Sequence, residues 1–399
     1  MEHTLQEKYG LKRVINASGR MSILGVSVPS DTVMEAMKAG GQRYVEIADL
    51  VDKSGERAAD LLGAEAAVIV NSASSGIALC TAACVTRGSR RQSLRLHQEP
   101  LPANEIVMLK GHNVQYGAPV EAMIYLGGGK VIEAGYANEG HAWQLEEAIS
   151  DRTAAVLYVK SHHTVQKNML SVEEAWLVAQ RRGVPLIVDA AAEEDLQRYV
   201  TCSDLVIFSG SKALEGPSSG LVAGKRTYVE WVKMQLHGIG RSMKVGKETM
   251  FGLLQALEEY MSRCRQADPS GQSSGDDDGL LQTLLPLNEM PGLRVSLVAD
   301  EAGRAIRRGR IHVDAEAAGL NALQLAERLR TGEIAIYTRD YGVRQGYFDI
   351  DPRPLQGDDI AVLAAAIRDI AAQAAGEAAG QRLKPGESAK REGTGGEKA

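Results

Sequence analysis

An aspartate and a lysine stand at the ends of two successive apolar segments in the middle of the chain. Asp189 closes the run PLIVD, and Lys212 follows the run DLVIFS inside the small-residue segment SGSKALEGPSSG. A buried carboxylate can keep a pyridine nitrogen protonated, and a desolvated lysine of lowered pKa readily forms a Schiff base. The pair therefore predicts a site for pyridoxal phosphate (PLP), with Asp189 at the ring nitrogen and Lys212 at the aldehyde.

A serine-enzyme reading of the same segment is weaker. Ser209 and Lys212 match the S-x-x-K signature of penicillin-binding enzymes, but that signature needs partner S-D-N and K-T-G elements, and the chain contains no K-T-G. Its serine also opens a helix, whereas Ser209 ends an apolar run. We therefore set this alternative aside.

A third segment offers groups for a phosphate. NSASSG (71–76) follows the apolar run AAVIV and opens the helical run IALCTAACV. Small residues let the backbone approach an anion, and a helix N-terminus supplies unpaired N–H groups, although an ordinary serine cap is the commoner role of such a turn. The residues predicted to bind the cofactor phosphate are Ser74, Ser75 and Gly76, with Ser209 and Ser211 as further hydroxyl donors.

Three histidines follow apolar runs, at the end where α/β proteins bind ligands. His112, in LKGHNVQYGAPV, is predicted to stack on the cofactor ring, although a satisfied surface histidine is the ordinary alternative. His162 and His163 are candidates for a proton donor or for a partner of the cofactor's phenolic oxygen. Adjacent histidines rarely share one metal ion, so we predict no metal site.

Several cationic residues could bind an acidic substrate, although most arginines and lysines are simply solvated. Arginine binds a carboxylate through two parallel hydrogen bonds, and Arg339 is the first candidate for this role, with Arg353 as the alternative. The candidates for a more distant phosphate are Arg20, Arg241, Lys244 and Lys247.

The elements that must position these residues alternate between strand-like and helical patterns. Helical segments such as 143–150 and 172–183 separate the apolar runs, which indicates an α/β fold with a mostly parallel sheet covered by helices. The predicted strands are 66–70, 105–109, 129–134, 154–159, 185–190, 204–209 and 219–224.

A second, smaller α+β domain is expected after a polar break. The predicted parts are an N-terminal arm (1–25), a large PLP-binding domain (26–265), a flexible Gly-, Ser- and Asp-rich insert (266–279), a small C-terminal domain (280–374) and a disordered tail (375–399).

Composition narrows the function classes. The net charge of −6 gives no basic footprint for nucleic acid, and no apolar run approaches the roughly 20 residues of a membrane span. The N-terminal segment has no signal-peptide core, and the four cysteines lack metal-ligand spacing. We expect a cytoplasmic protein with no nucleic-acid or membrane partner.

Longer strings resemble a known family. RVINASGR (13–20), the turn at 71–76, FSGSKALEGPSSGLVAGK (208–225) and MKVGKE (243–248) resemble the selenocysteine synthase (L-seryl-tRNA selenium transferase) superfamily of fold-type-I PLP enzymes. Other strings closely resemble one sugar-acid-degrading branch of it, the D-glucosaminate-6-phosphate ammonia-lyases. They are INASGRMSILGVS, LKGHNVQYGAPV, GGGKVIEAGYANE, SHHTVQKNMLSVE, IVDAAAEEDL and GEIAIYTRDY.

The resemblance implies a cofactor, an assembly and a reaction. It implies a homodimer or higher homo-oligomer with active sites at a subunit interface, and it carries Lys212, Asp189, the 71–76 turn and His112 over to the PLP roles given above. The reaction would remove water and then ammonia from D-glucosaminate 6-phosphate to give 2-keto-3-deoxy-6-phosphogluconate. Lys212 would take the C2 proton, and His163, His162 or Lys212 would assist departure of the C3 hydroxyl.

Departures from the family and alternatives complete these expectations. The tRNA-dependent members carry an N-terminal tRNA-binding domain, whereas here RVINASG begins at residue 13, so we expect no selenocysteine role. A PLP lyase or aldolase acting on another amino acid or on an unphosphorylated amino-sugar acid stays open. A non-catalytic scaffold or regulator with this fold is a further alternative, which the complete set of Lys212, Asp189 and phosphate turn disfavours.

Overall fold

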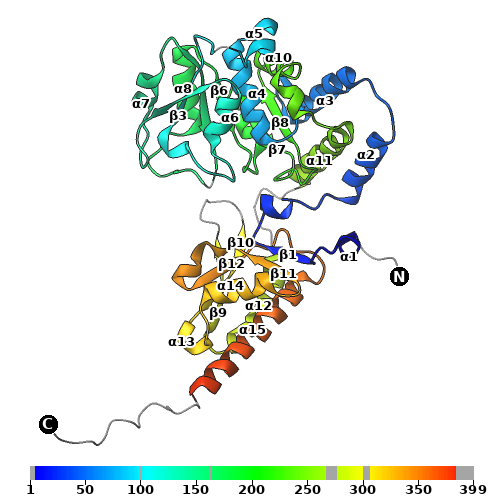
Figure 1. The fold of residues 1–399 in the computed structure, drawn as a ribbon, viewed down its shortest axis with the longest axis vertical. Coiled ribbons are helices and arrows are strands. Elements are labelled where there is room, and N and C mark those ends of the chain that lie inside the picture. Colours follow the sequence, from blue (N-terminus) through cyan, green and yellow to red (C-terminus); the bar gives the residue numbers. More distant parts are fainter. Residues whose placement is uncertain (1–4, 99, 162, 267–275, 300–305, 383–399) are drawn as a thin grey trace, which may run out of the picture. The chain divides into compact units, whose positions relative to one another are not determined.

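The chain folds into two compact units, each with its own core. A computed structural model describes residues 5–98, 100–161, 163–266, 276–299 and 306–382. The large unit is Gly25–Ala267, and the small unit joins Met1–Leu24 to Asp268–Ala399 (Figure 1). These divisions lie close to the domain limits predicted at 26 and 265.

One sheet forms the centre of the large unit. Its strand order is β2-β8-β7-β6-β5-β3-β4, in which β8 runs antiparallel to both neighbours and all other neighbours are parallel. The strands are β2 (Ala66–Val70), β3 (Glu105–Leu109), β4 (Lys130–Ala134), β5 (Thr153–Val159), β6 (Leu186–Asp189), β7 (Leu205–Ser209) and β8 (Gly220–Gly224). The predicted mostly parallel sheet is therefore confirmed, with each strand displaced by at most one residue at either end.

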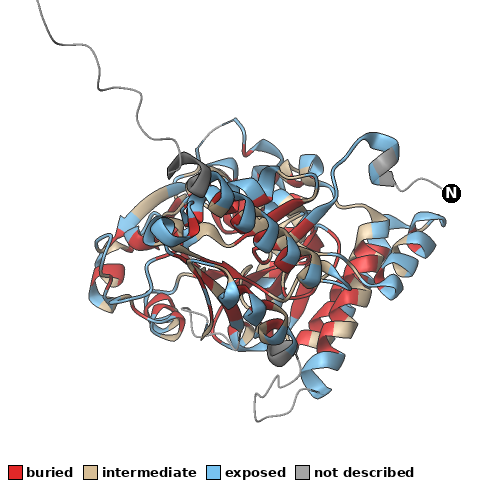
Figure 2. Cartoon of the chain, turned by 90° about the horizontal axis from the view of Figure 1, so that it is seen from below, coloured by how far each residue is buried: buried red, intermediate tan, exposed pale blue. Residues whose placement is uncertain are grey.

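Helices cover both faces of this sheet, which explains the continuous apolar runs of its strands. Successive strand residues belong to different apolar clusters, Val206 to one face and Ile207 to the other. Figure 2 shows the buried residues gathered in the strands and on the inner sides of the helices. The helices are α2 (Asp31–Gly41), α3 (Ile47–Leu62), α4 (Ala73–Thr86), α5 (Arg90–Arg95), α6 (Val120–Leu126), α7 (Ala142–Ala148), α8 (Val172–Arg182), α9 (Leu196–Thr201), α10 (Arg226–Gln235) and α11 (Lys247–Gln266), with the 3-10 turns η2 (Lys110–His112) and η3 (Ile239–Met243).

The small unit has the expected α+β character and draws on both ends of the sequence. An antiparallel sheet has the order β12-β10-β9, and β1 pairs in parallel with β11. The strands are β1 (Val14–Ala17), β9 (Leu293–Ala299), β10 (Arg307–Val313), β11 (Ala335–Thr338) and β12 (Tyr347–Ile350). The helices are α1 (Leu5–Tyr9), α12 (Asp276–Leu284), α13 (Ala315–Ala318), α14 (Ala322–Thr331) and α15 (Asp359–Arg382), with η1 (Ser22–Leu24), η4 (Leu285–Glu289) and η5 (Asp340–Gln345). The predicted N-terminal arm (1–25) is thus part of this unit up to Leu24, through the pairing of β1 with β11.

Two predicted irregular segments are partly helical. Helix α12 begins at Asp276, inside the predicted insert 266–279, of which 267–275 lie outside the described residues. Helix α15 continues to Arg382, beyond the predicted start of the tail at 375, because AAQAAGEAAG is rich in alanine, the best helix former. Residues 383–399 lie outside the described part of the chain.

Among the described residues, no helix combines the length and the apolar character that a bilayer crossing requires. In the same part of the chain, no group of three or more histidine, cysteine, aspartate or glutamate side chains is arranged to hold a metal ion.

Candidate active site

Asp189 and Lys212 come from adjacent strands at one edge of the large sheet. Asp189 is the last residue of β6 and pairs in register with Ile207 of β7. The backbone N–H of Ala190 donates to the Ile207 carbonyl at 3.0 Å, and Lys212 follows three residues beyond the end of β7. The carboxyl ends of β5, β6 and β7 meet at this edge, where parallel α/β sheets bind ligands.

The carboxylate of Asp189 is buried, with 9% of the residue exposed. It accepts a hydrogen bond from the backbone N–H of Ala191 at 3.1 Å. Burial raises the pKa of Asp189 to about 6, while the Ala191 hydrogen bond and the positive charge of Lys212 act in the opposite direction. The two predicted PLP residues therefore interact electrostatically, and a buried acid of this kind suits a cationic ring nitrogen.

Lys212 lies in the closed turn that joins β7 to β8. The N–H of Gly210 donates to the Ser219 carbonyl at 2.9 Å, and the N–H of Gly216 donates to the Gly210 carbonyl at 2.8 Å. A Cβ atom at Gly210 would lie 2.0 Å from Ser219 Oγ, so a larger residue there would have to displace the Ser219 side chain. Lys212 is half-buried, and the turn holds its backbone at the end of β7.

The predicted phosphate turn packs against the same hairpin. Ser72 caps α4, accepting from the backbone N–H of Ser75 at 3.0 Å, and the hydroxyls of Ser72 and Ser75 lie 2.6 Å apart. A Cβ atom at Gly220 would lie 2.5 Å from the Ser72 carbonyl carbon, and one at Gly76 would lie 2.8 Å from Ile207 Cγ2. The α4 N-terminus therefore sits on β7 and β8, beside Ser209 and Ser211, whose hydroxyls are 3.4 Å apart.

Tyr116 joins this group although its sequence position gave no signal. Its hydroxyl donates to Ser74 Oγ at 3.1 Å. Burial raises the pKa of Tyr116, the Ser74 hydrogen bond lowers it, and the charge of Asp189 raises it again. Tyr116 thus contacts the predicted phosphate turn and lies within electrostatic range of Asp189. Only the tertiary fold brings the loop after β3 to α4.

His112 is fully buried at the end of β3. Its ring meets Tyr158 edge-on, with ring centroids 4.5 Å apart, and neither ring nitrogen has a hydrogen-bond partner among the described residues. Burial, together with the charge of Lys160, lowers the pKa of His112 to about 4. The backbone of Val165 opposes part of this shift, although it does not form a hydrogen bond with either ring nitrogen of His112. His112 is therefore neutral near pH 7, and its stacking role stays a prediction.

The loop after β5 contains a second residue that sequence reasoning missed. The backbone N–H of Lys160 donates to the Asp189 carbonyl at 2.8 Å, and its ammonium donates to Gln166 Oε1 at 2.6 Å. His163 is exposed, and its backbone N–H donates to Ser161 Oγ at 3.3 Å. His162, the other predicted proton donor, lies outside the described residues.

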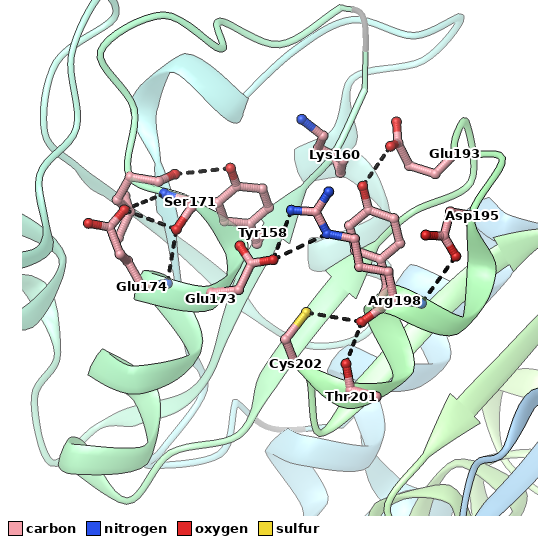
Figure 3. A network of polar contacts seen from close by, with 12 residues as sticks. Tyr158, Lys160, Ser171, Glu173, Glu174, Glu193, Asp195, Arg198, Thr201 and Cys202 are labelled. Atoms are coloured by element: carbon pink, nitrogen blue, oxygen red, sulfur yellow. Dashed lines mark hydrogen bonds and ion pairs between the residues drawn. The ribbon is translucent and has the colours of Figure 1, made fainter. Parts of the chain in front are cut away.

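A polar network fixes the loop that follows Asp189. Arg198 of α9 donates twice to Glu173 Oε1 of α8, at 3.2 and 2.9 Å (Figure 3). The adjacent Tyr199 donates to Glu193 Oε2 at 2.6 Å, and Glu193 lies in the loop that begins at Asp189. The network therefore ties the middle of that loop, at Glu193, to α9 and ties α9 to α8. Lys160 stands apart from it in Figure 3.

The predicted substrate cations of the large unit have different surroundings. The ammonium of Lys247 donates to the carbonyls of Gly40, Gly41 and Arg43 at 2.8, 2.5 and 2.5 Å, which occupies it at the C-terminus of α2. Arg241 and Lys244 are exposed in and after η3. Asn71, beside the phosphate turn, donates to the Lys244 carbonyl at 3.3 Å, so Lys244 remains near the site.

Two predicted arginines of the small unit, Arg353 and Arg339, contact residues of that unit. Arg353 donates to both oxygens of Asp351, at 2.9 and 2.8 Å. The Arg339 guanidinium lies 4.6 Å from the ring centroid of Tyr341. Arg20 is half-buried just after β1. Their roles toward a substrate stay predictions.

The groups of the large unit fit PLP. Asp189 would hold the ring nitrogen, and Lys212 would bind the aldehyde. Ser72, Ser74 and the first turn of α4 would hold the phosphate, in a cradle that side chains at Gly76 and Gly220 would fill. The donor set is a buried carboxylate, an amine and hydroxyls with backbone amides, which matches a pyridine ring carrying an aldehyde and a phosphate.

Comparison with known proteins gives consistent matches. Residues 14–269 match the family model described as L-seryl-tRNA selenium transferase (SelA). D-Glucosaminate-6-phosphate ammonia lyase of Salmonella typhimurium (strain 14028s / SGSC 2262) is 46% identical over 94% of this chain and 100% of its own length. A 5'-C-glycyluridine monooxygenase-decarboxylase of Streptomyces sp is 38% identical over 89% of each chain. A solved structure of a D-glucosaminate-6-phosphate ammonia-lyase superposes with a TM-score of 0.87, at 46% identity, over 94% of this chain and 100% of that one.

Proposed function

Because this chain belongs to the L-seryl-tRNA selenium transferase (SelA) family, we propose that it is a PLP-dependent ammonia-lyase that converts D-glucosaminate 6-phosphate to 2-keto-3-deoxy-6-phosphogluconate and ammonia. Its architecture is that of the fold-type-I PLP enzymes. The 46% identity over the full length of a D-glucosaminate-6-phosphate ammonia lyase supports the substrate.

One observation carries the proposal. The charge of Lys212 acts on the buried carboxylate of Asp189, at the edge of the sheet where Gly220 packs against the Ser72 turn. An amine, a carboxylate and a phosphate turn at one edge form a PLP site, and each comes from a different strand end.

When bound, PLP supplies an electron sink that stabilises negative charge at the substrate carbon next to the amino group. The Lys212 amine would be the base for the C2 proton, and its fixed position would supply a large proximity advantage. Asp189 would keep the ring nitrogen protonated. His163 is our candidate for the acid that protonates the departing C3 hydroxyl.

Other features of the proposal concern binding and location. Our candidates for the substrate carboxylate stay Arg339 and Arg353, and those for a distal phosphate stay Arg20, Arg241 and Lys244. The free state of all four cysteines supports a reducing compartment such as the cytoplasm. The family resemblance supports a homodimer or larger homo-oligomer.

The test is an assay of the PLP-loaded protein with D-glucosaminate 6-phosphate and, in parallel, D-glucosaminate. We expect ammonia and 2-keto acid release with the phosphorylated compound, and no release by Lys212→Ala, which also loses the visible absorbance of lysine-bound PLP. A visible band without turnover of either compound would keep the PLP site and reject the substrate.

The second candidate is a PLP enzyme acting on a different amine. The Streptomyces relative is 38% identical to this chain and is named a 5'-C-glycyluridine monooxygenase-decarboxylase. An oxygen-consuming reaction of the PLP-loaded protein with an amino-acid-bearing nucleoside, together with inactivity toward D-glucosaminate 6-phosphate, would favour this candidate.

A further inference from the structure

Lys160 is a cation beside the proposed PLP site that the mechanism above does not use. It is the first residue after β5, and its backbone N–H donates to the carbonyl of Asp189 at 2.8 Å. Its half-buried side chain donates one hydrogen bond, to Gln166 Oε1 at 2.6 Å. An ammonium has three donors, so this bond leaves Lys160 able to bind another acceptor.

The strand order determines which edge of the cofactor faces Lys160. In PLP the ring nitrogen is opposite the aldehyde carbon, and the phenolic oxygen and the phosphate-bearing carbon flank the aldehyde on opposite sides. The phosphate turn packs on β7 and β8, as the Gly76–Ile207 and Gly220–Ser72 approaches show. Strand β5 lies on the other side of β6 from β7 and β8. The phenolic oxygen of a cofactor held by Asp189 and Lys212 therefore faces β5.

Other groups at this position are less suitable partners for an anionic oxygen. His112 is neutral and buried, and it meets Tyr158 edge-on. The Tyr158 hydroxyl already donates to the Leu170 carbonyl at 3.0 Å. His163 is the remaining candidate in the described part of this loop, and it is exposed.

We propose that the ammonium of Lys160 binds the phenolic oxygen of PLP and holds it in the anionic form. The inference rests on the proposed function, because it presumes that PLP is the cofactor. A cation here lowers the pH at which the Lys212-bound cofactor loses its proton, since it favours the more negative form. Lys160 would thereby keep Lys212 ready for exchange with a substrate amine near neutral pH.

Several titratable or charged groups surround this position and act on the same equilibrium. They are Asp189 after β6, Glu193 in the following loop, Lys212 after β7, His112 in η2, and His163 and Lys167 in the loop that contains Gln166. The test must therefore separate Lys160 from its neighbours.

The experiment is a pH titration of the visible absorbance of PLP-loaded protein without substrate. In Lys160→Met we expect the midpoint to rise by about one pH unit or more, because a charge within roughly 4 Å is removed. Lys160→Gln is titrated alongside in case the Met variant binds PLP poorly. Lys160→Arg keeps the charge and should stay near the original midpoint. Lys167→Met is the matched control, since it removes an exposed lysine of the same loop.

Each result has a defined meaning. A rise in Lys160→Met or Lys160→Gln that Lys167→Met does not reproduce supports the contact. An unchanged midpoint in both Lys160 variants, an equal rise in Lys167→Met, or a rise only in His163→Gln would overturn it. If the unaltered protein develops no visible band with PLP, the proposed function itself fails, which is a separate outcome.

Discussion

At the scale of single residues, Asp189 suits a bound cofactor better than it suits the cofactor-free protein. Burial of its carboxylate raises the pKa to about 6 from the usual 3.8. A carboxyl group whose pKa is higher in the folded protein than in the unfolded chain stabilises the fold at pH values below its unfolded-state pKa. This stabilisation is lost as the pH rises through its folded-state pKa. Above pH 6, the charged Asp189 carboxylate therefore stays buried in the cofactor-free protein at a cost in folding free energy.

We predict that Asp189→Asn makes the cofactor-free protein more stable at pH 8, by about 1–3 kcal/mol. Asparagine removes the charge and can still accept from the Ala191 N–H. Urea unfolding at pH 8 and pH 5 measures the difference, which should shrink at pH 5 because Asp189 is then mostly protonated. An equal effect at both pH values would contradict the burial argument. PLP-loaded Asp189→Asn should turn over far more slowly.

Tyr116 leads to a second prediction at this scale. Its hydroxyl donates to Ser74 at 3.1 Å and so orients a proposed phosphate ligand. Tyr116→Phe removes one hydrogen bond, and we expect the Kd for PLP to rise about fivefold, which corresponds to roughly 1 kcal/mol. Absorbance titration with PLP measures it. Tyr136→Phe, at a 63% exposed position, is the control and should bind normally.

The sequence allowed the PLP residues to be predicted but not their neighbours. Asp189, Lys212 and the 71–76 turn each follow an apolar strand, a pattern that is visible in the chain itself. Lys160 follows an apolar strand as well, but its relation to Asp189, like that of Tyr116 to Ser74, exists only after folding. Lys247 looked like a substrate cation, yet three backbone carbonyls at the end of α2 surround its ammonium.

At the scale of elements, the close approach of β8 to the α4 N-terminus shapes the phosphate cradle. A Cβ atom at Gly220 would lie 2.5 Å from the Ser72 carbonyl carbon, so alanine there must displace the turn. We predict that Gly220→Ala raises the Kd for PLP at least tenfold, or about 1.4 kcal/mol. Absorbance titration of the folded variant tests this.

Gly376→Ala is the matched control for this substitution. Gly376 lies in α15, and a Cβ atom there would meet nothing within 4 Å. We expect unchanged PLP binding and a helix stabilised by up to about 1 kcal/mol. If Gly220→Ala bound PLP as tightly as this control, the turn would not depend on the approach of β8.

Elements buried on both faces were predictable, and short paired elements were not. The strands of the large sheet are continuous apolar runs because helices cover both sides. β1 and β12 have four residues each and were not predicted as strands. β11 pairs with β1, which lies at the other end of the sequence, and local pattern cannot reveal such a pairing.

At the scale of the whole molecule, the proposed PLP residues all belong to the large unit, while Asp351 stabilises the small one. Asp351 is fully buried and accepts from Arg308 at 3.2 Å as well as from Arg353. Burial alone would raise the pKa of Asp351, but the hydrogen bonds and charge of Arg353, with the charge of Arg308, lower it. The ion pairs of Asp351 with the two arginines therefore stabilise the folded protein above pH 3.8, the usual pKa of aspartate. This stabilisation is lost as the pH falls through the lower pKa that Asp351 has in the folded protein.

We predict that Asp351→Asn destabilises the small unit by about 3–5 kcal/mol, because the substitution removes the buried negative charge that pairs with Arg308 and Arg353. Calorimetry measures the loss, and the visible band of bound PLP should persist at low temperature. Asp358→Asn is the control, since its exposed pair with Arg13 at 3.1 Å is worth roughly 1 kcal/mol at most. Loss of the PLP band in folded Asp351→Asn would contradict the separation of roles.

The parallel pairing of Val14–Ala17 with Ala335–Thr338 has a consequence for biosynthesis. A ribosome that adds roughly 5–20 residues per second releases the first strand tens of seconds before its partner is made. The large unit, continuous from Gly25 to Ala267, is translated entirely within that interval. The earliest strand of the chain is thus among the last to find its place, and until then its backbone hydrogen-bonding groups have no β11 to pair with.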